Sequence, residues 1–532
     1  MSYTKFNRIF YKLINTILVI LIGISLFFSL QSDILSIDKL TNLFIKFLFY
    51  FFIVLFISIL FVKKKYLKSI LIGLHKQESY IFWILFLSVF LYQVFLLHYL
   101  KASPNFDAGG LLSGIDHPKA ANMSNYLSSN KNNRFIYFLN FFIGQLFGTD
   151  IKTFQFINIL FIMASTLLTK IVGTKLFEST TTGYFAASLF MFYSGVQPLF
   201  LVPYTDTYCI LPMLISILFL LIGFQSSTRT HISLYLLLSG IFFSICYLIR
   251  PSAIIFGIAI FMFILVNLKQ PKVKQFIFWG IPSFLISMIT VLFTFNIFIS
   301  NQNIIRIDQS KEIPLTHFIL LGSYGNPDIK DSLHGTWNQA DVDLTLQQKS
   351  KSAMINVDLN AFSERTKQRG FSKTIKFYLQ KYSNITDTGV IGYHRDGLWT
   401  KFKYDKNNTL VYKIQQIYSD HGIFRPNFNF IIQIIWLFTL FFMLCGLLKT
   451  PTWQFSVVSL TLFGGLLFLL IFESGGTKYL FQYIPFICFL SAVGFVQSAN
   501  KFLKKANYKF NPNKPGIFQW QSVDDVFLMV VD

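Results

Sequence analysis

The sequence predicts an all-helical protein that crosses a membrane about twelve times. Of its 532 residues, 53% are apolar and 18% aromatic, while only 13% are charged, and the mean hydropathy is +0.54. A soluble chain of this size needs a more polar surface. The apolar residues also gather into stretches close to the roughly 20 residues that a helix needs to cross a bilayer. The chain is therefore expected to be a polytopic membrane protein, with one small segment of mixed α and β structure outside the membrane.

The expected spans follow from the length of each apolar stretch. The first apolar run is too long for a cleavable signal peptide and lacks a small-residue cleavage site, so it is expected to be retained as a span. A further stretch at 135–148 has only 14 residues, which suits an interfacial or re-entrant helix better than a span. The expected spans are 13–30, 41–62, 79–99, 153–172, 183–200, 207–224, 232–249, 251–268, 276–299, 427–447, 453–472 and 477–497.

The distribution of basic residues predicts the orientation. The net charge is +22, and in a membrane protein such an excess belongs on cytoplasmic loops beside anionic lipid, so nucleic acid is not an expected partner. With the N-terminus inside and 135–148 at the interface, the inside segments carry 20 basic residues and the short outside segments eight. Both termini then lie inside, while 100–152, the loop near Asp206, 300–426 and the loop at Glu473 lie outside. The abundance of Phe, Ile, Lys and Asn suggests a bacterial cytoplasmic membrane.

Four regions follow from this topology. Residues 1–300 form a transmembrane module with a functional loop at 100–152, residues 301–426 an extracytoplasmic domain, residues 427–497 the last spans, and residues 498–532 a cytoplasmic tail. The four cysteines all fall in apolar runs, so they are expected to be small buried residues, with neither disulfides nor a zinc site. Polar candidates in 301–426 match no metal or nucleophile motif and are expected on an ordinary surface: His317, His334, His394, Arg395 and Asp396.

The polar stretch 101–134, between long apolar runs, carries the first candidate site. Asp107 precedes Ala-Gly-Gly, which lets the backbone turn closely and approach a ligand. Asp116 and His117 follow a short turn or helix later. A carboxylate beside an apolar span is costly and therefore suggests a function, here a general base. Alternatively, Asp107 caps a helix in an ordinary loop.

Three further positions lie on the same predicted outer face. Asp206, in the run Pro-Tyr-Thr-Asp-Thr at 203–207, could supply a second carboxylate or simply cap the next helix. Arg250 joins two apolar runs, and an uncompensated Arg at this depth would attract an anion such as a lipid-linked phosphate; the alternative is a structural Arg at the interface. Lys478, before Tyr479, could add a second phosphate contact or merely anchor a polar turn. The chain has no P-loop, no dinucleotide fingerprint and no Gly-x-Ser-x-Gly motif.

In order and sidedness these motifs resemble the glycosyltransferase C superfamily, and within it the bacterial protein mannosyltransferase and lipid A aminoarabinose transferase type. The likeness covers residues 80 to 497 and departs in three respects. Ala108 stands where many members have a second acidic residue, the run 129–133 lacks the proline of a Tyr-Pro-Asn-Asn run, and three spans instead of one precede the loop. The likeness is carried by Asp107-Ala-Gly-Gly, the run YLSSNKNNR from Tyr126 to Arg134, PYTDT at 203–207, Ile249-Arg250-Pro251-Ser252, His317 to Gly322, and Lys478 to Pro485.

The resemblance implies an inverting transfer of a sugar from a polyprenyl-phosphate-linked donor to an extracytoplasmic acceptor, which would be a cell-wall polymer, a glycolipid or a protein. By position, Asp107 would deprotonate the acceptor hydroxyl, alone or with Asp116. Asp206 would support the acceptor or a catalytic divalent cation, and Arg250 and Lys478 would hold the donor phosphate. Neighbouring substrate contacts are expected from His117, Tyr204 and Tyr479. An envelope polysaccharide polymerase or ligase, and a transporter or flippase, stay open as alternatives.

Overall fold

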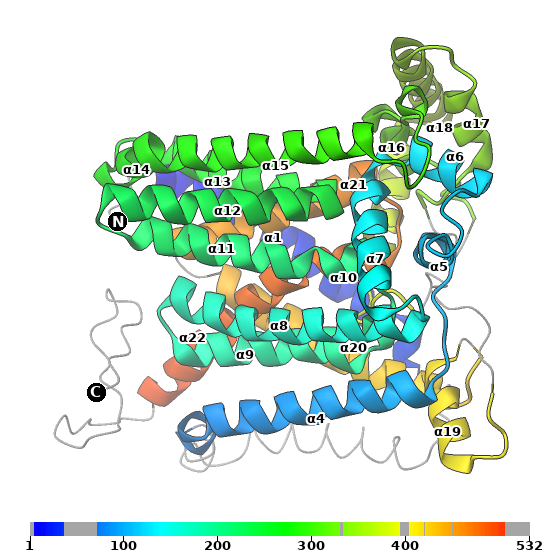
Figure 1. Cartoon of the computed structure of the whole chain (residues 1–532). Helices are drawn as coiled ribbons and strands as arrows, with labels where there is room; N and C mark the ends of the chain where they lie inside the picture. The colour runs from blue at the N-terminus through cyan, green and yellow to red at the C-terminus, as the bar shows by residue number, and fades with distance from the viewer. Residues whose placement is uncertain are drawn as a thin grey trace.

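The structure is a computed structural model, and it describes residues 5–36, 72–329, 334–393, 404–419, 421–448 and 452–505. All regular elements in these ranges are helices, and no β-strand occurs among them (Figure 1). The predicted all-helical polytopic class is therefore confirmed. The span expected at 41–62 lies outside the described residues.

Nine helices among the described residues are long and apolar enough to span a membrane, and each coincides with a predicted stretch. Where such a helix begins next to water, a side chain often caps it: Asp150 accepts a hydrogen bond from the backbone amide of Lys152, and Thr452 caps Phe455. The helices are α1 (Lys5–Leu30), α4 (Glu78–Tyr99), α8 (Ile151–Phe177), α10 with α11 (Thr205–Tyr208 and Ile210–Gln225), α12 (Arg229–Ile249), α14 through η7 to α15 (Pro271–Gln275, Phe276–Gly280 and Ile281–Asn301), α20 (Arg425–Leu447), α21 (Trp453–Phe472) and η9 with α22 (Thr477–Tyr483 and Ile484–Lys505).

Two predicted spans are shorter helices. The stretch 183–200 folds as α9 (Thr180–Met191), followed by a π-turn over Phe192–Val196 and a 3-10 turn over Pro198–Leu201. The stretch 251–268 contains the 3-10 turn Pro251–Ala253 and then α13 (Ile254–Val266). Apolar composition therefore located these segments correctly, although neither is one long straight helix.

The bundle is held by close helix pairs around one apolar core: α8 packs on α9, α11 on α12, α12 on α15, and α20 on α22. Small residues allow the α20–α22 approach, since a Cβ atom on Gly494 would overlap the carbonyl oxygen of Phe442, and one on Gly446 would lie 3.1 Å from the carbonyl oxygen of Leu490. Membrane helices associate through such small-residue contacts.

We expect Gly494→Ala to destabilise the protein by about 1–3 kcal/mol, because the added methyl overpacks the α20–α22 contact. Thermal unfolding in detergent measures the loss. Gly23→Ala in α1 is the matched control, because no atom beyond its own stretch of helix lies within 4 Å of the place that the added methyl would take. Equal losses in the two variants would contradict the packing explanation.

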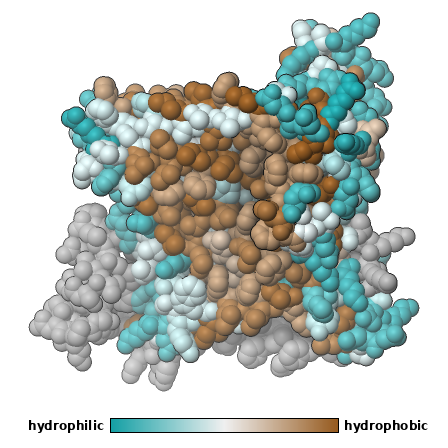
Figure 2. All heavy atoms as spheres, in the orientation of Figure 1, coloured by the Kyte–Doolittle hydropathy of each residue, from teal (hydrophilic) through white to brown (hydrophobic). Residues whose placement is uncertain are grey.

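One end of the bundle carries most of the polar helices (Figure 1), and we call it the polar end. It comprises α5 (Phe106–Ser113), α6 (Ala121–Ser129), α7 (Arg134–Phe147), α16 (Leu315–Gly322), α17 (Gln339–Leu346), α18 (Lys351–Thr386) and α19 (Thr409–Tyr418). Figure 2 shows a broad hydrophobic surface over the spanning helices and hydrophilic residues gathered over α16, α17 and α18. This division matches a bundle embedded in lipid with its loops in water.

Helix α7, predicted to be interfacial, runs across the ends of the spanning helices instead of alongside them (Figure 1). One side of α7 is buried in the protein at Ile136, Tyr137 and Asn140, while Leu146 and Phe147 are exposed. An exposed apolar edge on a helix in this orientation suits the boundary between lipid and water. The arrangement agrees with the interfacial helix expected at 135–148.

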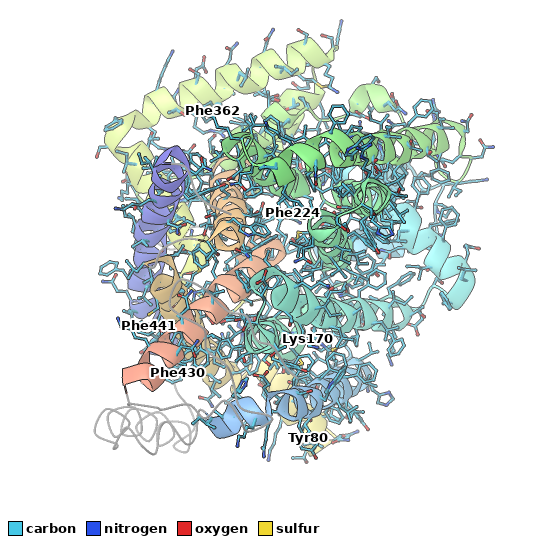
Figure 3. The ribbon with its side chains drawn as sticks, turned by 90° about the vertical axis from the view of Figure 1, so that its left-hand side faces the viewer. Tyr80, Lys170, Phe224, Phe362, Phe430 and Phe441 are labelled. Atoms are coloured by element: carbon cyan, nitrogen blue, oxygen red, sulfur yellow. The ribbon has the colours of Figure 1, made fainter. Side chains whose placement is uncertain are left out.

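The mixed α and β structure expected for 301–426 is wrong for the part of this segment that the structure describes, which is helical. Its long helix α18 bends at Gly370, whose φ is +75°, and the end-on view in Figure 3 places the α18 residue Phe362 at the edge of the bundle, whereas Phe224 lies among the spanning helices. The expected surface position of two histidines is also wrong, since His317 and His334 are both buried. The other three candidates, at 394–396, lie outside the described residues.

Candidate active site

Asp107 lies in the first turn of α5, at the polar end. The N-cap of this helix is Asn105, so Asp107 does not cap it; its exposed carboxylate instead lies near the positive end of the helix dipole. The turn into α5 depends on Gly109, because a Cβ atom there would overlap the carbonyl oxygen of Pro104. Of the two glycines, only Gly109 is needed for this close turn, because no neighbouring atom lies within 4 Å of the place that a Cβ atom on Gly110 would take.

Two tyrosines contact the Asp107 carboxylate, and an asparagine contacts both tyrosines. The hydroxyl of Tyr204 donates towards Asp107 Oδ2 at 3.3 Å and also lies 3.2 Å from Asn133 Oδ1. The amide of Asn133 donates to the hydroxyl of Tyr126 at 2.5 Å, and Tyr126 also hydrogen-bonds Asp107. Burial first, and then Asp107, raise the pKa of both phenols well above 10. The tyrosines therefore remain neutral hydrogen-bond donors that orient the Asp107 carboxylate.

Arg250 lies between two carboxylates at the junction of α12 and the turn before α13. Its Nη1 atom donates to Asp206 Oδ1 at 2.6 Å, and its Nη2 atom to Glu473 Oε1 at 3.4 Å. The Arg250 and Asp206 side chains are 8% and 6% exposed. Nη1 also contacts Thr205 Oγ1 at 3.2 Å. Contrary to the expectation of an uncompensated Arg, the structure pairs Arg250 with two acids, because a buried charge needs compensation.

Arg250 and the two carboxylates each favour the charged form of the other. Burial lowers the pKa of Arg250, but Asp206 and Glu473 raise it by more, so the guanidinium is charged. Burial raises the pKa of Glu473 above 4.5, and Arg250 opposes this shift. Arg250 Nε is buried and has no hydrogen-bond partner among the described residues. The Nε–H group of Arg250 is thus an unused donor, although Nη1 and Nη2 both donate hydrogen bonds.

Tyr204 and Asp206 connect the two groups of residues, because α10 places both in one short turn of Thr205–Tyr208 and its N-cap. Tyr204 interacts electrostatically with Asp107, Asp206 and Tyr479. Tyr479 in turn lies under two cations, with the Arg250 guanidinium carbon 5.5 Å and Lys478 Nζ 5.0 Å from its ring centroid. The structure therefore brings Asp107, Tyr204, Asp206, Arg250 and the Lys478–Tyr479 pair together at the polar end.

Asp116 and His117 are not part of this group. Both side chains are exposed, and among the described residues neither has a hydrogen bond or ion pair to the cluster around Asp107 and Arg250. Asp116 instead lines a separate cavity of about 420 Å³ together with Asn105, Gly110 and Thr149. Asp116 therefore does not supply a second carboxylate beside Asp107 for the expected deprotonation of the acceptor hydroxyl.

Asp206, which the resemblance implies could support a divalent cation, does not fit that role because Arg250 engages its carboxylate. Within the described ranges, no three Asp, Glu, His or Cys side chains form a group that could hold a metal ion. Asp206 and Glu473 are instead occupied by Arg250. The four cysteines are free, as expected.

Three residues of the group had no assigned role in the sequence. Tyr126 and Asn133 both belong to the run YLSSNKNNR at 126–134. Their spacing of seven residues does not indicate that they lie together beside Asp107. In the sequence, Glu473 stands only in a polar loop between two apolar stretches. Its distance of 223 residues from Arg250 explains why no local pattern could reveal the ion pair.

The site lies in a region that a protein-family model also covers. The model, described as "Conserved hypothetical integral membrane protein", matches residues 6–499. The chain belongs to this family. The family's description agrees with the nine candidate spans found in the described part of the chain, and it states no activity. Among curated proteins, none matches the chain.

Two solved structures show a distant likeness to this family member. ArnT from Cupriavidus metallidurans bound to undecaprenyl phosphate is 12% identical, with a TM-score of 0.32, and the match covers 83% of each chain. The archaeal oligosaccharyltransferase AglB from Archaeoglobus fulgidus, in complex with an inhibitory peptide and a dolichol-phosphate, is 11% identical, with a TM-score of 0.39. That match covers 82% of this chain and 53% of AglB. Because both TM-scores lie below 0.5, neither likeness identifies an activity.

Proposed function

We propose that this member of the integral membrane family is a glycosyltransferase of the glycosyltransferase C type. It would move a sugar from a polyprenyl-phosphate-linked donor to an extracytoplasmic acceptor, a cell-wall polymer, a glycolipid or a protein. The proposal rests on one observation: Tyr204 and Asp206, in a single turn, link an exposed carboxylate at Asp107 with the cationic centre at Arg250. Undecaprenyl phosphate and dolichol phosphate, the lipids in the two solved structures, belong to the same class as the proposed donor.

The proposed reaction uses each residue once. Asp107 accepts the proton of the acceptor hydroxyl, and the hydroxyl oxygen attacks the anomeric carbon of the donor from the side opposite the phosphate. The bond between that carbon and the phosphate oxygen breaks, so the sugar inverts and polyprenyl phosphate leaves. Arg250 and Lys478 carry positive charge beside Tyr479 and stabilise the charge that develops on the phosphate. Tyr126 and Tyr204 keep the carboxylate in place.

Turnover of defined donors tests the proposal. The purified protein in lipid nanodiscs receives a panel of undecaprenyl-phosphate-linked hexoses and N-acetylhexosamines, together with envelope material from the source strain lacking this protein. Mass spectrometry should show release of undecaprenyl phosphate from one donor and a matching mass added to an envelope component. Movement of intact donor across a vesicle membrane without release of undecaprenyl phosphate would instead identify a flippase and refute the transferase.

A further inference from the structure

A buried lysine outside the spanning helices holds the end of α21. Lys381, on α18, is fully buried, and its ammonium donates to the carbonyl oxygen of Gly322 at 2.7 Å and to that of Leu470 at 2.8 Å. These carbonyls belong to the last turns of α16 and α21, where helices leave such groups without partners. Among the described residues, no carboxylate forms an ion pair with Lys381 within 4.0 Å. One cation thus joins two helix ends.

The chain that Lys381 holds leads directly into the candidate site. Glu473, which pairs with Arg250, follows Leu470 by three residues. Two further contacts fix the same loop to residues beyond the spanning helices: the amide of Gly475 donates to the carbonyl oxygen of His334 at 2.7 Å, and the amide of Gly392 donates to Thr477 Oγ1 at 2.9 Å.

The approach is too close for ordinary side chains. Gly335 has φ +74°, and a Cβ atom there would lie 3.0 Å from Lys381 Nζ and 3.1 Å from the carbonyl oxygen of Glu473. A Cβ atom on Gly322 would overlap the carbonyl oxygen of Ile471. Glycine at these two positions therefore lets the 301–426 segment pack closely against the end of α21.

We infer that Lys381 is a positioning residue for the candidate site. By holding the end of α21 from α18, it keeps the Glu473 carboxylate on Arg250 and so fixes the orientation of the guanidinium. The 301–426 segment thereby becomes part of the site, although none of its described residues hydrogen-bonds Asp107 or Arg250. The effect on catalysis rests on the proposed glycosyl transfer; the mechanical link between Lys381 and the loop does not.

The charge of Lys381 changes near neutral pH. Burial lowers its pKa to about 7, and Glu473 opposes this shift. The other ionisable groups nearby are His334, which faces Lys381 from the chain before α17, and Arg369 on α18 itself. A neutral amine still has two N–H donors, so both carbonyl contacts survive deprotonation. What is lost as pH rises through about 7 is the positive charge facing Glu473.

Hydrogen exchange of the full chain in nanodiscs tests the mechanical link without any substrate. Lys381→Met should speed exchange in the peptide 470–479 by about tenfold, the effect of losing roughly one hydrogen bond's net free energy. The control is Lys376→Met, which removes an exposed lysine from the same helix that pairs with the exposed Asp328, and it should leave this peptide unchanged. If Lys381→Met does not accumulate, Lys381→Gln replaces it with the same expected direction. Unchanged exchange in 470–479 overturns the inference.

The pH profile of sugar transfer separates positioning from general folding. Wild-type activity should fall as pH rises through about 7, because Lys381 then loses the positive charge that faces Glu473. Lys381→Met should be at least about tenfold less active at pH 6, since small displacements of site groups cost up to ~10²-fold, and its residual activity should show no step near pH 7. A step with the wild-type midpoint in Lys381→Met contradicts the positioning role. Absence of transfer by the wild type would refute the proposed function alone, because the exchange result would still decide the mechanical link.

Discussion

Asp107→Asn is expected to lower the rate of sugar transfer by about 10²- to 10⁴-fold, the usual contribution of a general base. The amide has nearly the same shape, and its oxygen can still accept from Tyr204, but it cannot take the proton of the acceptor hydroxyl. Expression and the unfolding temperature should therefore match the wild type. Transfer is measured as release of undecaprenyl phosphate from the preferred donor.

Asp116→Asn is the matched control for this change. Asp116 is an exposed aspartate in the same polar stretch, and it lines a different cavity, so its replacement should leave transfer within about twofold of wild type, as is usual away from a site. Full activity in Asp107→Asn would exclude Asp107 as the base. Loss in Asp116→Asn alone would move that role to Asp116.

Arg250→Ala is expected to destabilise the protein by about 3–5 kcal/mol, because it leaves the buried Asp206 and the partly buried Glu473 without their cation. Unfolding in a series of detergent mixtures measures the loss. Arg229→Ala provides the control, since Arg229 is an exposed arginine at the opposite end of the same helix and stacks on Trp279 at 5.1 Å. Its removal should cost less than about 1 kcal/mol.

A double-mutant cycle then isolates the ion pair. Arg250→Ala combined with Asp206→Ala should cost clearly less than the two single changes added together, because each single change already breaks the same contact. Additive losses would mean that the pair contributes little to stability. The main role of Arg250 would then be to bind a ligand. In that case a stably folded Arg250→Ala protein should show a higher KM for the sugar donor.

Much of the membrane architecture could be predicted because hydropathy is a local property. Nine predicted spans within the described residues coincide with long helices, and two more contain the shorter helices α9 and α13. The 14-residue stretch at 135–148 forms the crossing helix α7. The prediction for 301–426 was wrong because short apolar runs fit a helix or a strand equally well. The run Lys376-Phe-Tyr-Leu-Gln-Lys-Tyr382 is part of α18, and contact with α21 and α1 decides its conformation.

The sequence by itself determined that this chain is a polytopic membrane protein, and it pointed to Asp107, Asp206 and Arg250 as charged residues at span ends. Only the tertiary structure decided how these charges combine. Arg250 is matched to Asp206 and Glu473, which lie 44 and 223 residues away, and the buried Lys381 reaches the end of α21 across 89 residues. The physical reason is that the hydropathy of a segment depends only on its own residues. The compensation of a buried charge depends instead on which distant helix ends meet in the folded protein.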